Sequence, residues 1–404
     1  MVEKEGPHIH WKRIFLCIAI LFTIIGIIVA SVKFFSNKQQ NNKLTNVKMI
    51  EIDSVINEVE IPNDVTITLT AIGDIMCHNT QYQDAYQNGI YNFSYVFDDI
   101  RDELSSADFT VGNLETTFAG SQKGYSSYPQ FNTPESLALA LKDAGIDLVC
   151  TANNHSLDTG YSGIESTINF LDQAGIMHTG TYKTAEAQSQ ITIAEIKGLK
   201  VAFLSFTYGT NGIPIPVGKE YCINLIDDNF IVDRLRVAKQ EKPDIICVFM
   251  HWGEEYDTVP NQEQIRLANL LFDNGANVIL GSHPHVLQRM EKVTLGAEAA
   301  NREGFVIYSL GNFVSGQVKE NTRDSIILNL SITKKGTGEV KINSVKYTPI
   351  YTYKSGASLR QFKVLNIKKA LDAFEVKNKY ITEKDYTLLT KEYNKILSTV
   401  GPEY

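Results

Sequence analysis

Short apolar runs alternate along this chain with longer amphipathic stretches, and this alternation limits the folds open to it. Seven runs rich in β-branched and aromatic residues indicate strands: VTITLTAIG, ADFTVGN, IDLVCTA, KVAFLSF, DIICVFM, ANVILGS and GFVIYSLG. Segments 134–144, 163–174 and 261–274 indicate helices, the first with Thr133 as its N-cap. SIILNLSITKK and EVKINSVKYTPI then predict an antiparallel hairpin. Together these elements predict an α/β domain.

Six polar motifs directly follow strand-like runs. They are GD, GNLE, NNH, HWGE, GSHPH and GNF, which begin at Gly73, Gly112, Asn153, His251, Gly281 and Gly311. Sites in α/β sheets assemble where strands end, and five of the eight histidines lie in or beside these motifs. Carboxylate, amide and imidazole groups together suit Mn²⁺, Fe or Zn²⁺ better than Ca²⁺. The motifs therefore predict a two-metal hydrolytic site.

In this order the motifs resemble the signature of calcineurin-like metallophosphoesterases. More closely, GDIM, GNLE, TANNHSLDTG, HWGEEY, GSHPHVLQ and YSLGNF resemble the CapA, or poly-γ-glutamate synthesis, family. The resemblance covers residues 65–350. We expect a four-layer α/β/β/α sandwich there, with two mixed sheets face to face and helices outside, because strands alternate with helices before they become hairpin-like.

The resemblance also implies roles for individual residues, with two divalent cations (Mn, Fe or Zn) as cofactors. One cation would be held by Asn154, His251 and His283. The other would be held by Asp74 and His285. By the same resemblance, His155 would face the substrate as a general acid or as a group that stabilises developing charge.

Two positions depart from the phosphoesterase pattern. The residue two after Asp74 is Met76 instead of histidine, so one metal lacks a ligand unless His78 reaches it. Asn113 replaces the aspartate that bridges the metals, and a neutral amide cannot bridge two cations as a carboxylate does. Glu115 could take this role, because it starts on the same face of the strand. Asn113 and Glu115 are both candidate metal ligands.

The motifs also have structural interpretations. His283 and His285 could be ordinary turn residues, and the asparagine-histidine motif could cap the helix that follows it. Glu254 could orient a ligand histidine. We expect Asn312 and Asp158 to fix turns.

The N-terminal region contains a candidate membrane anchor. Residues 14–32 carry no charge, and at about 1.5 Å per residue they would extend roughly 28 Å, close to the hydrocarbon thickness of a bilayer. A cleaved signal peptide is the alternative, although its apolar core is usually shorter. We expect a single-pass protein of the cell membrane, with residues 1–13 as a cytoplasmic tail and 33–64 as a tether. Residues 65–350 would then form an extracellular domain, followed by a polar extension at 351–404.

The net charge bears on the choice of binding partner, and the number of cysteines bears on disulfide bonds. A net charge of -8 disfavours nucleic acid as a partner, because an acidic surface repels polyanions. The five cysteines are few for a disulfide framework, and we expect free thiols.

Two classes of function fit these observations. The resemblance implies a part in poly-γ-glutamate capsule synthesis or export, together with a ligase and a small membrane partner. The chain has no Gly-x-x-x-x-Gly-Lys-Ser/Thr loop and should not itself be the ATP-using ligase. The alternative is an extracellular metal-dependent hydrolase, either a phosphoesterase or an amide hydrolase, that acts on cell-envelope material. A third possibility is a module that binds an anionic polymer without turnover.

Overall fold

The computed structural model describes residues 63–404 apart from three short gaps, at 296–302, 356–360 and 377–380. The expected membrane anchor at 14–32 and nearly all of its tether lie outside the described residues. Within the described part of the chain, no helix is long and apolar enough to cross a membrane.

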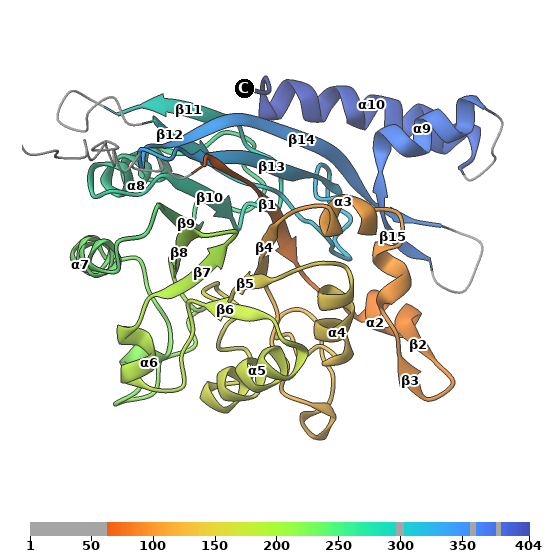
Figure 1. Ribbon diagram of the computed structural model, residues 1–404. Helices are drawn as coiled ribbons and strands as arrows, with labels where there is room; N and C mark the ends of the chain where they lie inside the picture. The colour runs from red at the N-terminus through yellow and green to blue at the C-terminus, as the bar shows by residue number, and fades with distance from the viewer. Residues whose placement is uncertain (1–62, 296–302, 356–360, 377–380) are drawn as a thin grey trace, which may run out of the picture. The chain divides into compact units, whose positions relative to one another are not determined.

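A mixed sheet of seven strands contains the first strand and the last three. Its strands are β1 (Val65–Ile75), β4 (Phe109–Leu114), β5 (Leu148–Cys150), β6 (Met177–Thr179), β13 (Asp324–Lys334), β14 (Val340–Lys354) and β15 (Phe362–Asn366). Their order is β15-β14-β13-β1-β4-β5-β6 (Figure 1). Strands β1, β4, β5 and β6 are parallel, whereas β13 to β15 pair antiparallel. The hairpin predicted from the alternating runs is thus confirmed as β13 and β14.

The second mixed sheet has six strands. They are β7 (Thr192–Ile196), β8 (Leu199–Thr207), β9 (Ile245–His251), β10 (Val278–Ser282), β11 (Met290–Thr294) and β12 (Glu303–Ile307). Their order is β11-β12-β10-β9-β8-β7, and only the edge strands β7 and β11 pair antiparallel with their neighbours. A separate small ribbon pairs β2 (Tyr86–Gln87) with β3 (Ile90–Tyr91).

Helices connect the strands and cover the sheets. The α-helices are α2 (Asn79–Ala85), α3 (Arg101–Ser105), α4 (Ser136–Asp143), α5 (Tyr161–Ala174), α6 (Ala185–Ser189), α7 (Asp228–Gln240), α8 (Gln262–Asp273), α9 (Ile367–Glu375) and α10 (Glu383–Val400). Three short 3₁₀ segments are η1 (Ser94–Phe97), η2 (Ser121–Lys123) and η3 (Glu220–Cys222).

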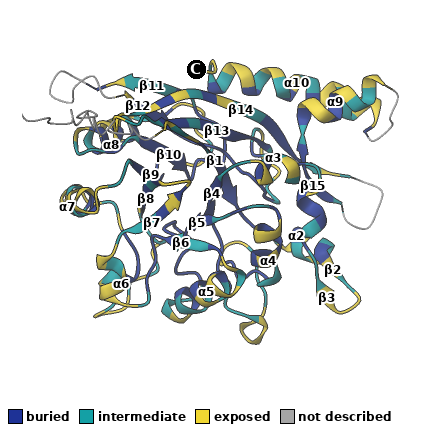
Figure 2. Cartoon of the chain, in the orientation of Figure 1, coloured by how far each residue is buried: buried dark blue, intermediate teal, exposed yellow. Residues whose placement is uncertain are grey.

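Three large apolar clusters define the layers. One cluster joins the facing sides of the two sheets, for example Leu69 and Val111 with Phe203 and Phe249. A second packs the outer side of the seven-stranded sheet against α3, α4 and α5. A third packs the outer side of the six-stranded sheet against α7 and α8. The predicted arrangement of two mixed sheets face to face with helices outside is therefore confirmed, and Figure 2 shows how fully the strands are buried.

One predicted helix start is wrong. The first residue of α4 follows Glu135, which is its N-cap, and not Thr133. The Thr133 hydroxyl is engaged elsewhere, 2.7 Å from the hydroxyl of Thr116. Helix α8 agrees with the predicted start to within one residue: it begins at Gln262, and the Asn261 side chain caps it by accepting a hydrogen bond from the Gln264 amide.

The residues after 350 complete the domain. They supply the end of β14, followed by β15, α9 and α10. Three residues of α10 belong to the same apolar cluster as the facing sides of the two sheets: Leu389, Ile396 and Val400. Figure 1 shows α9 and α10 lying along β14. The four cysteines in the described residues are buried free thiols, as predicted.

Candidate metal centre

Strand pairing brings the polar motifs together at one edge of the sandwich. Asp74 of β1 pairs with Asn113 of β4, and His251 of β9 pairs with Ser282 of β10. These strands run parallel to their partners, so the motifs that follow them emerge at the same edge. The backbone amide of His283 lies 3.4 Å from the Asp74 carboxylate, which joins the ends of the two sheets.

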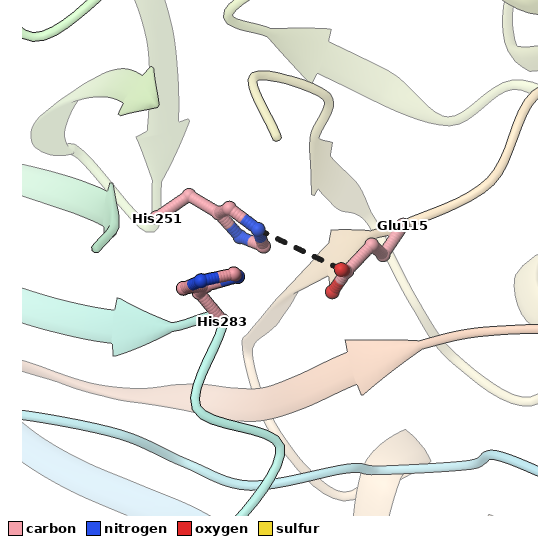
Figure 3. A group of neighbouring side chains, drawn as sticks. All are labelled: Glu115, His251 and His283. Carbon is pink, nitrogen blue, oxygen red and sulfur yellow. Dashed lines mark ion pairs between the residues drawn. The ribbon is translucent and has the colours of Figure 1, made fainter. Parts of the chain in front are cut away.

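Two groups of buried side chains have the composition and spacing of metal ligands. The first is Glu115, His251 and His283 (Figure 3), and the second is Asp74, Glu115 and His285. Within each group, one ligand atom of each residue lies within 4.8 Å of the others. Glu115 belongs to both groups, which is the arrangement required of a carboxylate that bridges two cations.

Within the described residues, one carboxylate oxygen of Glu115 has no hydrogen-bond partner and lies near two histidines. Its Oε1 lies 3.6 Å from His251 Nε2 and 3.7 Å from His285 Nε2, and it has no hydrogen-bond partner among the described residues. Asn113 donates to Glu115 Oε2 at 3.2 Å and to Asp74 Oδ1 at 2.8 Å. The Asn113 amide nitrogen thus links the two carboxylates, and a role of Asn113 as a metal ligand stays a prediction.

Contacts between the ring nitrogens and neighbouring polar side chains orient the histidines. The Nδ1 of His251 lies 2.9 Å from the Ser282 hydroxyl, and its Nε2 lies 2.7 Å from Asn154 Oδ1. His285 Nδ1 lies 3.1 Å from Asp74 Oδ2. Such contacts fix the rings of metal-binding histidines. Exposed Glu254, which could have oriented a histidine, has no such contact with these rings among the described residues.

The backbone of the His-Pro-His turn is strained. His283 has φ of +96° and His285 has φ of +59°, in a region that non-glycine residues seldom occupy. Strain of this kind persists where the surrounding structure fixes a functional geometry. Here it places both imidazoles beside the carboxylates of the other sheet.

Burial sets the protonation of these groups. Burial raises the pKa of Glu115 well above its ordinary value, and the neighbouring Asp74 carboxylate raises it further. Burial lowers the pKa of His251 well below its ordinary value and that of His283 to about 3. The imidazoles are therefore neutral, the form that binds metal. The Nδ1 of His283 is buried and has no hydrogen-bond partner within the described residues, so this donor set fits divalent cations.

A separate pair adjoins the centre. His155 Nδ1 lies 2.7 Å from Asp158 Oδ2, and the same oxygen accepts a hydrogen bond from the Phe131 amide at 2.6 Å. Asp158 thus orients His155, a role that goes beyond the turn-fixing role expected from the sequence. His155 lies outside both groups of candidate ligands.

His78 and Met76 lie shortly after Asp74 in the sequence. His78 belongs to neither group of ligands, and its Nδ1 accepts a hydrogen bond from the Gly316 amide at 3.1 Å. Met76 is buried, with its sulfur 3.8 Å from the Ser315 hydroxyl. The group containing Asp74 therefore offers three candidate protein ligands.

Sequence reasoning missed an aromatic wall of the centre. The Tyr208 ring lies 4.5 Å from that of His283 and stacks 6.2 Å from that of His251, measured between ring centroids. Asn211 accepts a hydrogen bond from Asn154 at 3.0 Å. Tyr208 follows β8 directly and Asn211 lies four residues beyond the end of that strand, so the rule that located the other motifs could have found them.

Comparisons with known proteins identify relatives of this chain. The family described as "Bacterial capsule synthesis protein PGA_cap" matches residues 68–317. The chain is 30% identical to the "Capsule biosynthesis protein CapA" of Bacillus anthracis over 67% of this chain and 65% of that protein. It is 29% identical to the "PGA biosynthesis protein CapA" of Bacillus subtilis over 71% of this chain and 73% of that protein.

Among solved structures, the calcineurin-like phosphoesterase YfkN from Bacillus subtilis aligns with a TM-score of 0.40 and 15% identity, over 71% of this chain and 90% of that one. The match to the capsule family covers more than half of the sequence and includes all six motifs. The chain belongs to the bacterial capsule synthesis protein family PGA_cap.

Proposed function

We propose that this chain is a metal-dependent component of poly-γ-glutamate capsule synthesis or export. The link to this polymer rests on relatives named for capsule and PGA biosynthesis. The proposed metal dependence rests on one observation: the buried Glu115 is shared by two groups of candidate ligands. A carboxylate so placed is costly to ionise without cations, and two cations would compensate it.

Each cation has a defined set of candidate ligands. Glu115, His251 and His283, with the nearby Asn154 oxygen, would hold one, and Asp74, Glu115 and His285 would hold the other. Bound divalent cations supply Lewis acidity to a polar substrate group.

The other residues of the centre have roles that their contacts support. Asn113 keeps the two carboxylates apart and aligned. The Asp158 contact holds the His155 ring, which can then move a proton through its other nitrogen.

Genetic complementation tests the proposal. In a strain that lacks the gene, the chain should restore polymer production, whereas His283→Ala should not. His178→Ala is the matched control, because His178 pairs with Asp172 outside both groups of ligands. Restoration of polymer by His283→Ala at wild-type protein levels would refute the metal-dependent role.

An extracellular hydrolase of cell-envelope material is the second candidate. The buried contact between His155 and Asp158 beside the candidate ligands favours it, because a histidine oriented by a carboxylate is suited to proton transfer. Assays of phosphodiester and γ-glutamyl bonds with added Mn²⁺ distinguish the candidates. Turnover of either bond that His155→Ala abolishes would support the hydrolase.

We further propose that residues 14–32 anchor the protein in the cell membrane with its large domain outside, beside a ligase and a small membrane partner. The uncharged apolar sequence of this segment supports the anchor. Full-length protein should fractionate with membranes, and deletion of residues 1–46 should release a folded, soluble protein. Full-length protein in the cytosolic fraction would refute the anchor.

A further inference from the structure

A polar cavity of about 270 Å³ lies between the loop before β13 and helix α10. Four basic residues line it: Lys319, Arg323, Lys391 and Lys395. The first two come from the loop, whereas the other two lie about one helical turn apart on α10. Within the described residues, none of the candidate metal ligands lines this cavity. It is therefore separate from the metal centre.

Two carboxylates neutralise one of these cations. Lys395 Nζ lies 2.5 Å from Asp324 Oδ2 and also contacts the carboxylate of Glu392. Both acids are buried, so their charges are committed to Lys395. The third acid that lines the cavity, Glu320, is exposed and forms no ion pair within the described part of the chain. With four bases against three acids, the lining carries a net charge of +1, although the whole chain carries -8.

Two of the remaining cations have no carboxylate of their own. Lys391 Nζ lies 3.9 Å from Glu392 Oε1, and this carboxylate already contacts Lys395. Arg323 forms no ion pair among the described residues and interacts instead with Tyr351, which also lines the cavity. Burial raises the pKa of Tyr351, while the charge of Arg323 and a hydrogen bond from it lower that pKa. Cations without counter-ions in a concave site attract anions.

Lys319 connects the cavity with the metal centre through Tyr256. Its Nζ lies over the Tyr256 ring, 3.4 Å from the centroid, and it forms no ion pair in the described ranges. The Tyr256 ring centroid lies 6.2 Å from that of His285. The Tyr256 amide also donates to the carbonyl oxygen of Pro284 at 2.8 Å. The cavity therefore adjoins the group of candidate ligands that contains His285.

Hydrogen bonds fix the loop that carries Lys319 and Arg323. The buried Asn312 side chain donates to the Thr322 carbonyl oxygen and to Gln317 Oε1, each at 2.9 Å. The Thr322 hydroxyl donates in turn to the carbonyl oxygen of Lys319 at 2.7 Å. Asn312 of the GNF motif thus fixes this loop, in agreement with the turn-fixing role expected from the sequence. A loop that is already ordered loses less entropy when it binds a ligand.

We propose that this cavity, lined by Lys319, Arg323 and Lys391, binds carboxylate groups of an acidic polymer. Lysine and arginine form charge-assisted hydrogen bonds with carboxylates. The position beside Tyr256 favours an extended chain over a small anion, because one chain can reach both the cavity and the metal centre. The choice of polymer rests on the proposed function, whereas the presence of an anion site does not. Inorganic phosphate has similar charge chemistry and is the alternative ligand.

Binding measurements on the full-length protein, with a chelator present, test the proposal independently of the metal centre. The probes are a short γ-linked glutamate oligomer, the same oligomer with its carboxylates converted to amides, and inorganic phosphate. We expect the acidic oligomer to bind, the amidated one not to bind, and phosphate to bind more weakly than the acidic oligomer. Affinity for the acidic oligomer should fall as salt rises, because salt screens exposed charges.

Charge reversals identify the residues that bind the oligomer. Lys319→Glu combined with Lys391→Glu should weaken binding at least about tenfold, because both exposed side chains then repel the ligand. Lys239→Glu combined with Lys368→Glu is the matched control, since these exposed lysines lie on α7 and α9 outside the cavity. It changes the net charge equally and should alter binding less than about twofold. Glu320→Gln should strengthen binding, a gain that loss of folding cannot mimic.

The outcomes distinguish this inference from the function proposed above. Equal weakening by the two pairs of charge reversals would show a general effect of net charge and would overturn the inference. Wild-type protein that binds no acidic oligomer, or binds it only with Mn²⁺ in place of the chelator, would also overturn it. Tighter binding of phosphate than of the oligomer would overturn the assignment to a polymer. Polymer production by His283→Ala tests the proposed function separately from all of these results.

Discussion

At the scale of residues, His283 gives the sharpest test of the metal centre. Its Nδ1 is buried and unpaired within the described residues, so His283→Ala removes a ligand without breaking a hydrogen bond of that atom. We expect metal affinity to fall at least about a hundredfold while the fold survives. Elemental analysis of purified protein measures this, with His178→Ala as the control. Unchanged metal content in His283→Ala would show that these residues do not bind metal.

His155 should respond differently, because it lies outside both groups of ligands. We expect His155→Ala to retain metal and to lose function. Asp158→Asn should cause a smaller loss of function, since it weakens the orientation of the ring but keeps the ring itself. Metal content and polymer production measured on the same preparations distinguish these effects. Loss of metal in His155→Ala, with metal retained in His283→Ala, would reverse the two roles.

The sequence predicted which residues gather at the centre but not how they contact one another. Asp74, Glu115 and the histidines could be found because each lies at or near the end of a strand. The pairing of Asp158 with His155, and the amide of Asn113 between two carboxylates, depend on side-chain direction. The sequence does not encode that direction in any short pattern.

At the scale of elements, apolar runs identified the buried strands and missed those with partly exposed faces. The edge strands β7 and β11 are half-buried along much of their length, so their sequences lack a continuous apolar run. The start of α4 was misplaced because Thr133 satisfies its hydroxyl through a tertiary contact. Such contacts override local capping preferences.

Helix α10 offers a test of how far the C-terminal region supports the domain. Leu389 is fully buried in the cluster between the sheets, whereas Leu397 on the same helix is 38% exposed. We expect Leu389→Ala to lower the free energy of unfolding by about 2 to 5 kcal/mol. Leu397→Ala should change it by less than about 1 kcal/mol. Denaturant unfolding measures both, and equal effects would show that α10 does not pack as described.

At the scale of the whole molecule, the candidate ligands come from both sheets of the sandwich. Asp74 near the end of β1 and Glu115 just after β4 belong to one sheet. His251 at the end of β9, with His283 and His285 after β10, belongs to the other. Divalent cations held between them would therefore link the two sheets. They would also relieve the cost of a buried Glu115, whose raised pKa makes the metal-free folded state less stable as pH rises through that value.

Metal binding should consequently stabilise the entire fold. With Mn²⁺ at 100 times its dissociation constant, linkage predicts a gain of about 2.7 kcal/mol for one site. Thermal unfolding with Mn²⁺ and with a chelator measures the gain. The stabilisation by Mn²⁺ should increase with pH, because burying the ionised Glu115 carboxylate destabilises only the metal-free protein. His283→Ala should reduce it, since that variant lacks one link between the sheets. A melting temperature that does not change while metal content rises would show that the cations bind elsewhere, away from the junction of the two sheets.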